Sequence, residues 1–266
     1  MPGPGELKQE KKAVLITGAS SGLGKALTEK FLHEGYKVYG VSRKNPPPEG
    51  AIWIKADITV PPERERIAGE VKDGLSVLVN CAGIGLYSRW EDATEEEIRK
   101  LFEVNFFAPV FLTKKLLPAL RKAATSKNPS VIINVSSVAA FLHTPFMGAY
   151  SSSKAALTMF SRSLRAELIK ENIRVIDVSP GRINTGFSTR AMGRANHPDL
   201  PFLSTPEKFA KAVYRVYRKA VKKNKNYELI HPRIYGFFRM LPALFPNLYD
   251  TKNLESWLKA NPDLNV

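Results

Sequence analysis

The chain has 266 residues and a formal net charge of +15 at pH 7, and its only cysteine is Cys81. This length suits one α/β domain with a large buried core. A single cysteine excludes an internal disulfide and a thiolate metal site, and it makes the reducing cytoplasm the expected compartment. Residues 1–12 show no signal-peptide pattern, and no run approaches the ~18 apolar residues of a membrane-spanning helix, so a soluble protein is expected.

Short apolar runs alternate with longer helical patterns along the chain. Strands are predicted near residues 13–17, 36–41, 51–55, 75–80, 130–136, 173–179 and 226–230. Helices are predicted near 23–34, 62–73, 95–121, 150–171 and 205–223. This alternation predicts an α/β fold, a single-domain Rossmann-like doubly wound parallel sheet of about seven strands with helices on both faces. The domain is expected to span 1–266, with a core over about 11–230 and a tail over 231–266.

The first predicted strand runs directly into a glycine-rich loop. Glycines there permit a tight turn and a close approach of the backbone to a phosphate, and the following helix N-terminus offers free N–H groups to the anion. The loop lacks the lysine of a Walker A motif, so it predicts a dinucleotide site, with a plain Gly/Ser-rich turn as the alternative for this segment alone. The residues expected to bind the cofactor are Gly18, Ser20, Ser21, Gly22, Leu23 and Gly24.

The second predicted strand ends in Ser42, Arg43 and Lys44. The adenosine ribose of a dinucleotide is expected here, and an acidic residue at this point would bind the 2′-hydroxyl of NAD. Two cations would instead attract a 2′-phosphate. We therefore predict that NADP(H) is preferred over NAD(H), with Arg43 as the main determinant and Lys44 as a lesser one. An ordinary solvated Arg-Lys pair is the alternative.

Tyr150 and Lys154 are four residues apart in a helical pattern, so they share one helix face. The unperturbed pKa of a tyrosine is about 10, and a neighbouring ammonium favours the phenolate and lowers that pKa. Such a pair can exchange a proton with an alcohol or a carbonyl. The spacing alone is common among solvated side chains, and only the accompanying motifs give it weight.

Together these motifs resemble those of the classical short-chain dehydrogenase/reductase (SDR) family. The match covers about residues 11–190, and the motifs follow the family's order. The matching residues are Thr17 to Gly24, Asn80-Cys81-Ala82-Gly83, Asn105, Ser136-Ser137, Tyr150 with Lys154, and Pro180-Gly181 followed by Thr185. The resemblance implies an NADP(H)-dependent oxidoreductase that interconverts a carbonyl and an alcohol by hydride transfer.

The resemblance also implies a role for each catalytic position. Ser137 would hydrogen-bond the substrate oxygen, with Ser136 as the fallback. Tyr150 would be the general acid/base, and Lys154 would lower its pKa and bind the nicotinamide ribose. Asn105 would hold a water that relays protons to Lys154, unless it only caps or kinks the helix predicted near 95–121.

Further cofactor contacts follow from the same resemblance. Asp57 and Ile58 would bind the adenine. Cys81 replaces the family's usual second asparagine and is expected to be a buried packing residue. The other positions implied to line the cofactor are Asn80, Ala82, Gly83, Pro180, Gly181, Ile183 and Thr185.

The substrate side of the site is less defined. His143 lies between Ser137 and Tyr150 and could contact a polar substrate group, although a loop-surface histidine is the alternative. The four histidines show no ligand spacing, so no metal is expected. Residues 186–204 are predicted to form a mobile lid over the pocket.

An apolar, aromatic segment flanked by cations occupies residues 232–246. A wall of the substrate pocket or a subunit contact is favoured, with a membrane-surface contact as the lesser alternative. A bulky apolar ketone, aldehyde or secondary alcohol would suit each of these interpretations. The resemblance implies a homodimer or homotetramer built through the helices near 95–121 and 150–171.

Basic residues concentrate over 215–225, but no nucleic-acid-binding module accompanies them, so a solvated helix face is favoured and no nucleic acid is expected.

Three functions remain open. The first is an NADP(H)-dependent carbonyl reductase or alcohol dehydrogenase. The second is a 3-oxoacyl reductase that acts on an acidic carrier protein, which would explain the positive charge. The third is a non-catalytic NADP(H)-sensing binding module, against which the intact Ser137, Tyr150 and Lys154 argue.

Overall fold

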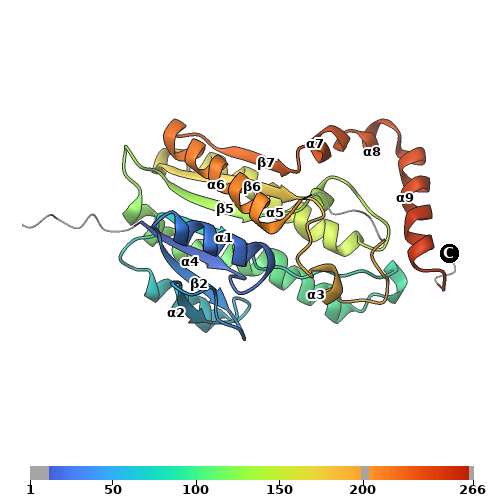
Figure 1. Ribbon diagram of the computed structural model, residues 1–266, viewed down its shortest axis with the longest axis horizontal. Helices are drawn as coiled ribbons and strands as arrows, with labels where there is room; N and C mark the ends of the chain where they lie inside the picture. Colours follow the sequence, from blue (N-terminus) through green and yellow to red (C-terminus); the bar gives the residue numbers. More distant parts are fainter. Residues whose placement is uncertain (1–11, 199–203, 264–266) are drawn as a thin grey trace, which may run out of the picture.

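A sheet of seven parallel strands forms the centre of the protein (Figure 1). The computed structural model describes residues 12–198 and 204–263. The strands pair in the order β3-β2-β1-β4-β5-β6-β7, which confirms the Rossmann-like doubly wound topology. Their bounds differ from the predicted ones by at most two residues at either end. They are β1 Ala13–Thr17, β2 Lys37–Ser42, β3 Ile52–Lys55, β4 Val77–Asn80, β5 Ser130–Val135, β6 Ile173–Pro180 and β7 Tyr227–His231.

Helices cover both faces of the sheet. One face packs against α1 Gly22–His33 and α6 Pro206–Lys223. The other packs against α2 Pro61–Glu70, α4 Ala108–Ala123 and α5 Gly148–Glu167. Within β1, the side chains of Val14 and Ile16 pack into the core on the α1–α6 face, and that of Leu15 packs into the core on the opposite face. Strands buried on both faces read as continuous apolar runs, which is why the sequence revealed them.

The helix predicted over 95–121 consists of three segments. These are α3 Glu95–Phe102, a π-helical turn η2 Glu103–Phe107, and α4. Thr94 begins α3 with a capping box, because its Oγ1 accepts from the Glu97 N–H at 3.2 Å and its own N–H donates to the Glu97 carboxylate at 3.0 Å. The π-helical turn contains Asn105, which it places in the protein interior.

The chain after β7 forms three further helices, none of which the sequence analysis predicted. They are α7 Ile234–Phe238, α8 Leu241–Leu244 and α9 Pro246–Ala260. Figure 1 shows α7 and α8 extending beyond the sheet and α9 turning back along the end of the molecule. The Trp257 ring anchors α9, since it is 1% exposed and packs against the rings of Tyr87, Phe146 and His197.

The predicted lid contains a short 3₁₀ turn, η5 Ser188–Arg190. Parallel bridges tie Met192 to Leu86 and Ser204 to Ile183. Lid residues 199–203 lie outside the described residues, as do 1–11 and 264–266 of the predicted domain. The remaining 3₁₀ turns are η1 Trp90–Asp92, η3 Val138–Ala140 and η4 Ile169–Glu171. Among residues 12–198 and 204–263, no helix has the length and apolar character needed to cross a bilayer.

Candidate active site

The glycine-rich loop brings β1 and α1 into close contact. Gly22 adopts a φ of +52°, and a Cβ added to Gly24 would lie 2.1 Å from the carbonyl oxygen of Gly18. Side chains at these two positions would strain or displace the turn. The loop and the N-terminus of α1 line a deep cavity, where the first N–H groups of the helix suit a phosphate.

Thr17 holds the carboxyl ends of β1 and β4 together. Its Oγ1 accepts hydrogen bonds from the N–H groups of Cys81 at 3.0 Å and Ala82 at 3.1 Å. As a result, Gly18 from β1 and Gly83 from β4 line the same cavity. This is the edge of the sheet at which ligands of doubly wound folds bind.

A groove at the carboxyl ends of β2 and β3 continues from this cavity. Ser20, Arg43, Asp57 and Ile58 line it, as predicted for the adenosine half of a dinucleotide, whereas Lys44 does not. Nη1 of Arg43 lies 3.6 Å from Oδ2 of Asp57, and the Arg43 side chain remains 59% exposed. The guanidinium therefore stands at the rim of the groove, accessible to an anion.

Asp57 stays ionised at this rim. Burial raises its pKa, but hydrogen bonds from the backbone and hydroxyl of Thr59, together with the Arg43 charge, outweigh burial and lower the pKa overall. No acidic side chain stands at the end of β2, where Ser42 is buried and accepts a 2.8 Å hydrogen bond from Nε1 of Trp53.

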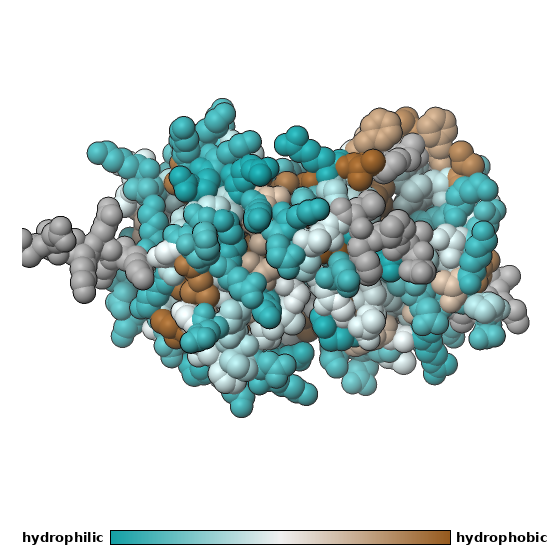
Figure 2. Space-filling view, viewed as in Figure 1, coloured by the Kyte–Doolittle hydropathy of each residue, from teal (hydrophilic) through white to brown (hydrophobic). Residues whose placement is uncertain are grey.

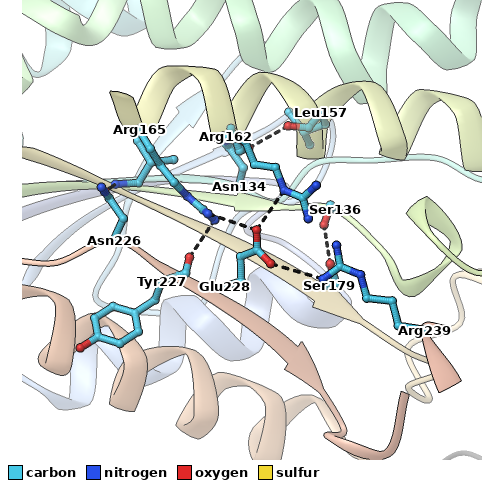
Figure 3. Close-up of polar contacts among 12 residues, drawn as sticks. Asn134, Ser136, Leu157, Arg162, Arg165, Ser179, Asn226, Tyr227, Glu228 and Arg239 are labelled. Atoms are coloured by element: carbon cyan, nitrogen blue, oxygen red, sulfur yellow. Dashed lines mark hydrogen bonds and ion pairs between the residues drawn. The ribbon is translucent and has the colours of Figure 1, made fainter. Parts of the chain in front are cut away.

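Ser137, Tyr150 and Lys154 meet in the cavity. Ser137 follows β5, and the other two lie on the first turns of α5. The three side chains are buried, and the Ser137 hydroxyl lies close enough to the Tyr150 phenol to lower its pKa. Ser136 is turned toward β6 instead, since its Oγ lies 3.0 Å from the Val178 carbonyl oxygen and 2.9 Å from Oγ of Ser179 (Figure 3). Ser137 rather than Ser136 therefore faces the phenol.

The pKa of Tyr150 differs from the sequence expectation in direction. Burial raises the pKa of Tyr150, and the hydrogen bond from Ser137 lowers it only in part. Lys154 does not depress it in this structure, because its Nζ donates to the carbonyl oxygen of Val135 at 3.0 Å. Burial also lowers the pKa of Lys154 to about 8, so near pH 7 the site holds a protonated phenol and a mostly protonated amine.

Asn105 lies behind this cavity and is fully buried. Its Oδ1 accepts from the Ile84 N–H at 2.9 Å, and its Nδ2 donates to the Ile84 carbonyl at 2.9 Å and to Oγ of Ser153 at 3.1 Å. A Cβ added to Gly83 would lie 3.2 Å from the Asn105 Oδ1 and 3.3 Å from Nζ of Lys154. The absent side chain of Gly83 thus leaves a small space bordered by both polar atoms.

Asn80 and Cys81 take different positions. The Asn80 side chain is buried inside the fold, where Nδ2 donates to Thr113 at 3.0 Å and to Asn134 at 2.8 Å, and it lines neither the cavity nor the groove. This differs from the expectation that Asn80 faces the cofactor, because the residue ends β4 within the sheet. Burial raises the pKa of the Cys81 thiol to about 12, so the thiol stays protonated near pH 7.

The substrate side of the cavity is largely apolar. Together with the loop region it measures about 380 Å³. The expected residues Ala82, Pro180, Gly181, Ile183 and Thr185 line it as well. The expected lid contributes Phe187 and the 232–246 segment contributes Tyr235, whereas sequence reasoning missed the part of the apolar wall that comes from α9 and from the loop before α5. That wall includes Leu142, Met147, Phe187, Tyr235, Tyr249 and Trp257.

His143 does not line this cavity, which argues against the substrate contact considered for it and agrees with the alternative of a loop-surface histidine. Its Nε2 lies 2.6 Å from Oδ1 of Asp250 on α9, and its ring packs edge-on against that of Tyr249. Its carbonyl oxygen accepts from the Tyr249 hydroxyl and from Nδ2 of Asn253, both at 3.0 Å. The residue therefore attaches α9 to the loop before α5. Tyr249 and Asn253, which bond its carbonyl oxygen, line the cavity in its place.

The cavity and the groove form one trough. Gly18, Ser21, Ala82, Gly83, Phe187 and Arg190 line both. An extended dinucleotide fits this shape, with Arg43 at the adenosine end, the glycine-rich loop at the phosphates and Tyr150 at the nicotinamide end. Within the described ranges, no cluster of His, Cys, Asp and Glu could hold a metal ion.

Comparison with known proteins agrees with this geometry. The model of the short chain dehydrogenase family matches residues 12–194. A 3-ketodihydrosphingosine reductase of Bacteroides thetaiotaomicron is 39% identical over 184 residues, which cover 67% of this chain and 66% of that protein. An NADPH-dependent 3-dehydrocapnine reductase of Ornithobacterium rhinotracheale is 37% identical over 195 residues, which cover 68% and 69%.

A solved structure superposes on most of this chain. A short-chain dehydrogenase from Burkholderia cenocepacia, crystallised in complex with NADP, superposes with a TM-score of 0.76 at 27% identity and covers 92% of this chain and 98% of its own. The cofactor trough and these matches agree on an NAD(P)-dependent dehydrogenase or reductase. The chain belongs to the short-chain dehydrogenase/reductase family.

Proposed function

We propose that this protein is an NADP(H)-dependent reductase of bulky apolar ketones or aldehydes, with Tyr150 as the proton donor. The observation that carries the proposal is that Ser137, Tyr150 and Lys154 are buried together in the wall of an apolar cavity that opens from the dinucleotide trough. A sensing module would have no use for a buried acid at this point. The same side chains act in reverse for alcohol oxidation.

The protonation state of the site favours reduction. Burial keeps the Tyr150 phenol protonated near pH 7, so Oη can donate its proton to the carbonyl oxygen of a substrate. The Ser137 hydroxyl orients that oxygen with a second hydrogen bond. Bound NADPH supplies the hydride to the carbonyl carbon. In this proposal Lys154 and Asn105 return a proton to Tyr150 through a water, which is supported by the space beside Gly83 that both side chains border.

The apolar wall supports the substrate class. Side chains such as Leu142, Met147 and Trp257 offer no charge to a small polar substrate but suit a large hydrocarbon surface. The relative named for 3-ketodihydrosphingosine acts on a keto group of a lipid, which agrees with this class.

NADP(H) preference over NAD(H) rests on Arg43. The guanidinium stands at the groove rim beside Asp57, and the end of β2 carries no carboxylate to repel a 2′-phosphate. Asp57 and Ile58 are placed to contact the adenine from the same groove.

The test follows NADPH and NADH oxidation with a panel of carbonyls that includes 3-ketodihydrosphingosine, aromatic aldehydes and steroid ketones. Tyr150→Phe should lower kcat by about 10²–10⁴-fold with NADPH binding retained. Arg43→Ala should lower kcat/KM for NADPH by about 10–100-fold and leave that for NADH nearly unchanged. Lys44→Ala is the matched control, because Lys44 lines neither cavity nor groove.

The proposal is wrong if Tyr150→Phe retains wild-type turnover. Turnover restricted to small polar carbonyls would reject the substrate class alone. An equal decrease in kcat/KM for NADPH in Arg43→Ala and Lys44→Ala would reject the assigned role of Arg43.

A further inference from the structure

An exposed apolar surface covers the outer side of the α7–α8 segment. We call it the apolar patch and define it as Ile234, Phe237, Met240, Leu244, Phe245 and Leu248, which are 51%, 80%, 58%, 61%, 56% and 62% exposed. Figure 2 shows these apolar side chains gathered over the end of the molecule, against a largely hydrophilic surface elsewhere in that view. A contiguous apolar surface of this kind marks an interaction site.

The segment that carries the patch is fixed to the protein by its inner side. The Tyr235 ring lies so close over Gly181 that a Cβ there would be 2.0 Å from the ring. Arg239, at the end of α7, lies 3.6 Å from Glu228 and over the Phe141 ring at 5.3 Å. Figure 3 shows Glu228 between Arg239 and the arginines of α5. The polar and aromatic contacts are therefore made inward, and the apolar side chains face outward.

The patch borders the entrance to the substrate cavity. Tyr235 and Tyr249 line the cavity from the same segment. A second hollow, lined by Phe245 and Leu248 of the patch, shares Tyr249 and Asn253 with the cavity. An apolar molecule held at the patch would thus lie next to the cavity, beside Tyr249.

Charge distinguishes the possible occupants of the patch. Arg233 begins α7 and Lys252 borders the second hollow, while residues 204–263 carry twelve Lys or Arg against five Asp or Glu. Most of these cations lie on α6 and just after it, at the start of β7, whereas the α7–α8 segment follows the other end of β7 (Figure 1), so Arg233 and Lys252 are the cations beside the patch. A second copy of the chain would bring its own Arg233 and Lys252 against these two cations, whereas anionic lipid headgroups would complement them.

We propose that the apolar patch docks on the surface of an anionic lipid bilayer, from which the enzyme takes its apolar substrate. The patch side chains would enter the interface between headgroups and acyl chains, with Arg233 and Lys252 at headgroup level. Substrate delivery rests on the function proposed above, but binding to the bilayer does not.

The test measures co-sedimentation of the full chain with phosphatidylcholine vesicles, with and without phosphatidylglycerol, over a range of salt concentrations. The double variant Phe237→Ser/Leu244→Ser removes two patch side chains. Its control, Trp90→Ser/Ile169→Ser, removes an aromatic and an aliphatic side chain that are 77% and 53% exposed elsewhere. We expect wild type to bind anionic vesicles, the patch variant to bind about tenfold or more weakly, and the control to bind as wild type does.

Salt should weaken the binding, because the attraction between exposed charges is screened. Failure to bind anionic vesicles, equal binding to neutral vesicles, or equal losses in both double variants would overturn the proposal. A patch variant that changes only the oligomeric state would assign the surface to a second copy. Reductase activity in detergent, unchanged in the patch variant, would separate a failure of docking from a failure of the proposed function.

Discussion

The Lys154 ammonium is buried beside the carbonyl of Val135, and burial lowers its pKa from 10.5 to about 8. An unfolded chain keeps the ordinary pKa, so between about pH 8 and 10 the unfolded state binds more protons than the folded state. The free energy of unfolding should therefore rise with pH in this window, by up to roughly 3 kcal/mol from this group.

Lys154→Met isolates this effect, because methionine fills similar space without a charge. At pH 7 the variant should have a higher free energy of unfolding than wild type. This difference in free energy should narrow as the pH rises through 8 toward 10. Urea unfolding of both proteins over this range measures the gap. A gap that stays constant with pH would show that burial does not depress the lysine pKa.

The neighbouring serines offer a second residue-scale prediction. Ser137 lines the cavity beside Tyr150 and lowers its pKa, whereas Ser136 bonds β6. Ser137→Ala should lower kcat by about 10²-fold with NADPH affinity unchanged, because a donor to the reacting oxygen is lost. Ser136→Ala should instead cost about 1 kcal/mol of stability, with a much smaller change in kcat. Steady-state kinetics and urea unfolding distinguish the two, and equal kinetic effects would place the substrate oxygen elsewhere.

At the scale of elements, Trp257 is the most deeply buried anchor of α9. Trp257 is buried among Tyr87, Phe146 and His197, so Trp257→Ala should destabilise the attachment of α9 by about 3–5 kcal/mol. The KM for bulky carbonyls should rise while NADPH affinity stays the same. Hydrogen exchange of residues 246–260 would report the loosened helix. Trp90→Ala, at a 77% exposed tryptophan, is the control and should change neither quantity.

The difference between predicted and observed elements has a physical basis. The strands and the glycine-rich loop follow from local signals, because a strand buried on both faces is apolar throughout and the tight turn requires glycine. Helices α7 and α8 are too short for a periodic pattern, and Pro232, Pro242 and Pro246 interrupt the segment. Their positions depend on tertiary contacts such as Tyr235 on Gly181, which no local pattern reveals.

The same limit applies within the site. Motif order placed Ser137, Tyr150 and Lys154 together, but it could not indicate that Lys154 bonds Val135 or that His143 bonds Asp250. Each of these contacts joins segments that meet only through the fold. The pKa of Tyr150 was therefore predicted in the wrong direction, since its burial could not be read from residue spacing.

At the scale of the whole molecule, an assembly of copies would use the side formed by α4 and α5. Phe107 and Phe111 stack there with ring planes 14° apart and are 40% and 43% exposed. We expect a homo-oligomer whose interface includes this pair. Phe111→Lys should shift the protein to a smaller species in light scattering after gel filtration, because a buried unpaired charge opposes association. Ile52→Lys, at a 42% exposed residue on β3, should leave the mass unchanged.

The trough that joins the two halves of the site also sets an order of events. Phe187 and Arg190 border both the adenosine groove and the catalytic cavity, so the loop at 186–190 crosses the middle of the path that the dinucleotide occupies. If the carbonyl substrate bound first, the side of the cavity that the nicotinamide would occupy would offer it no contacts. We therefore expect compulsory-order kinetics, in which NADPH enters before the carbonyl and NADP⁺ departs after the alcohol.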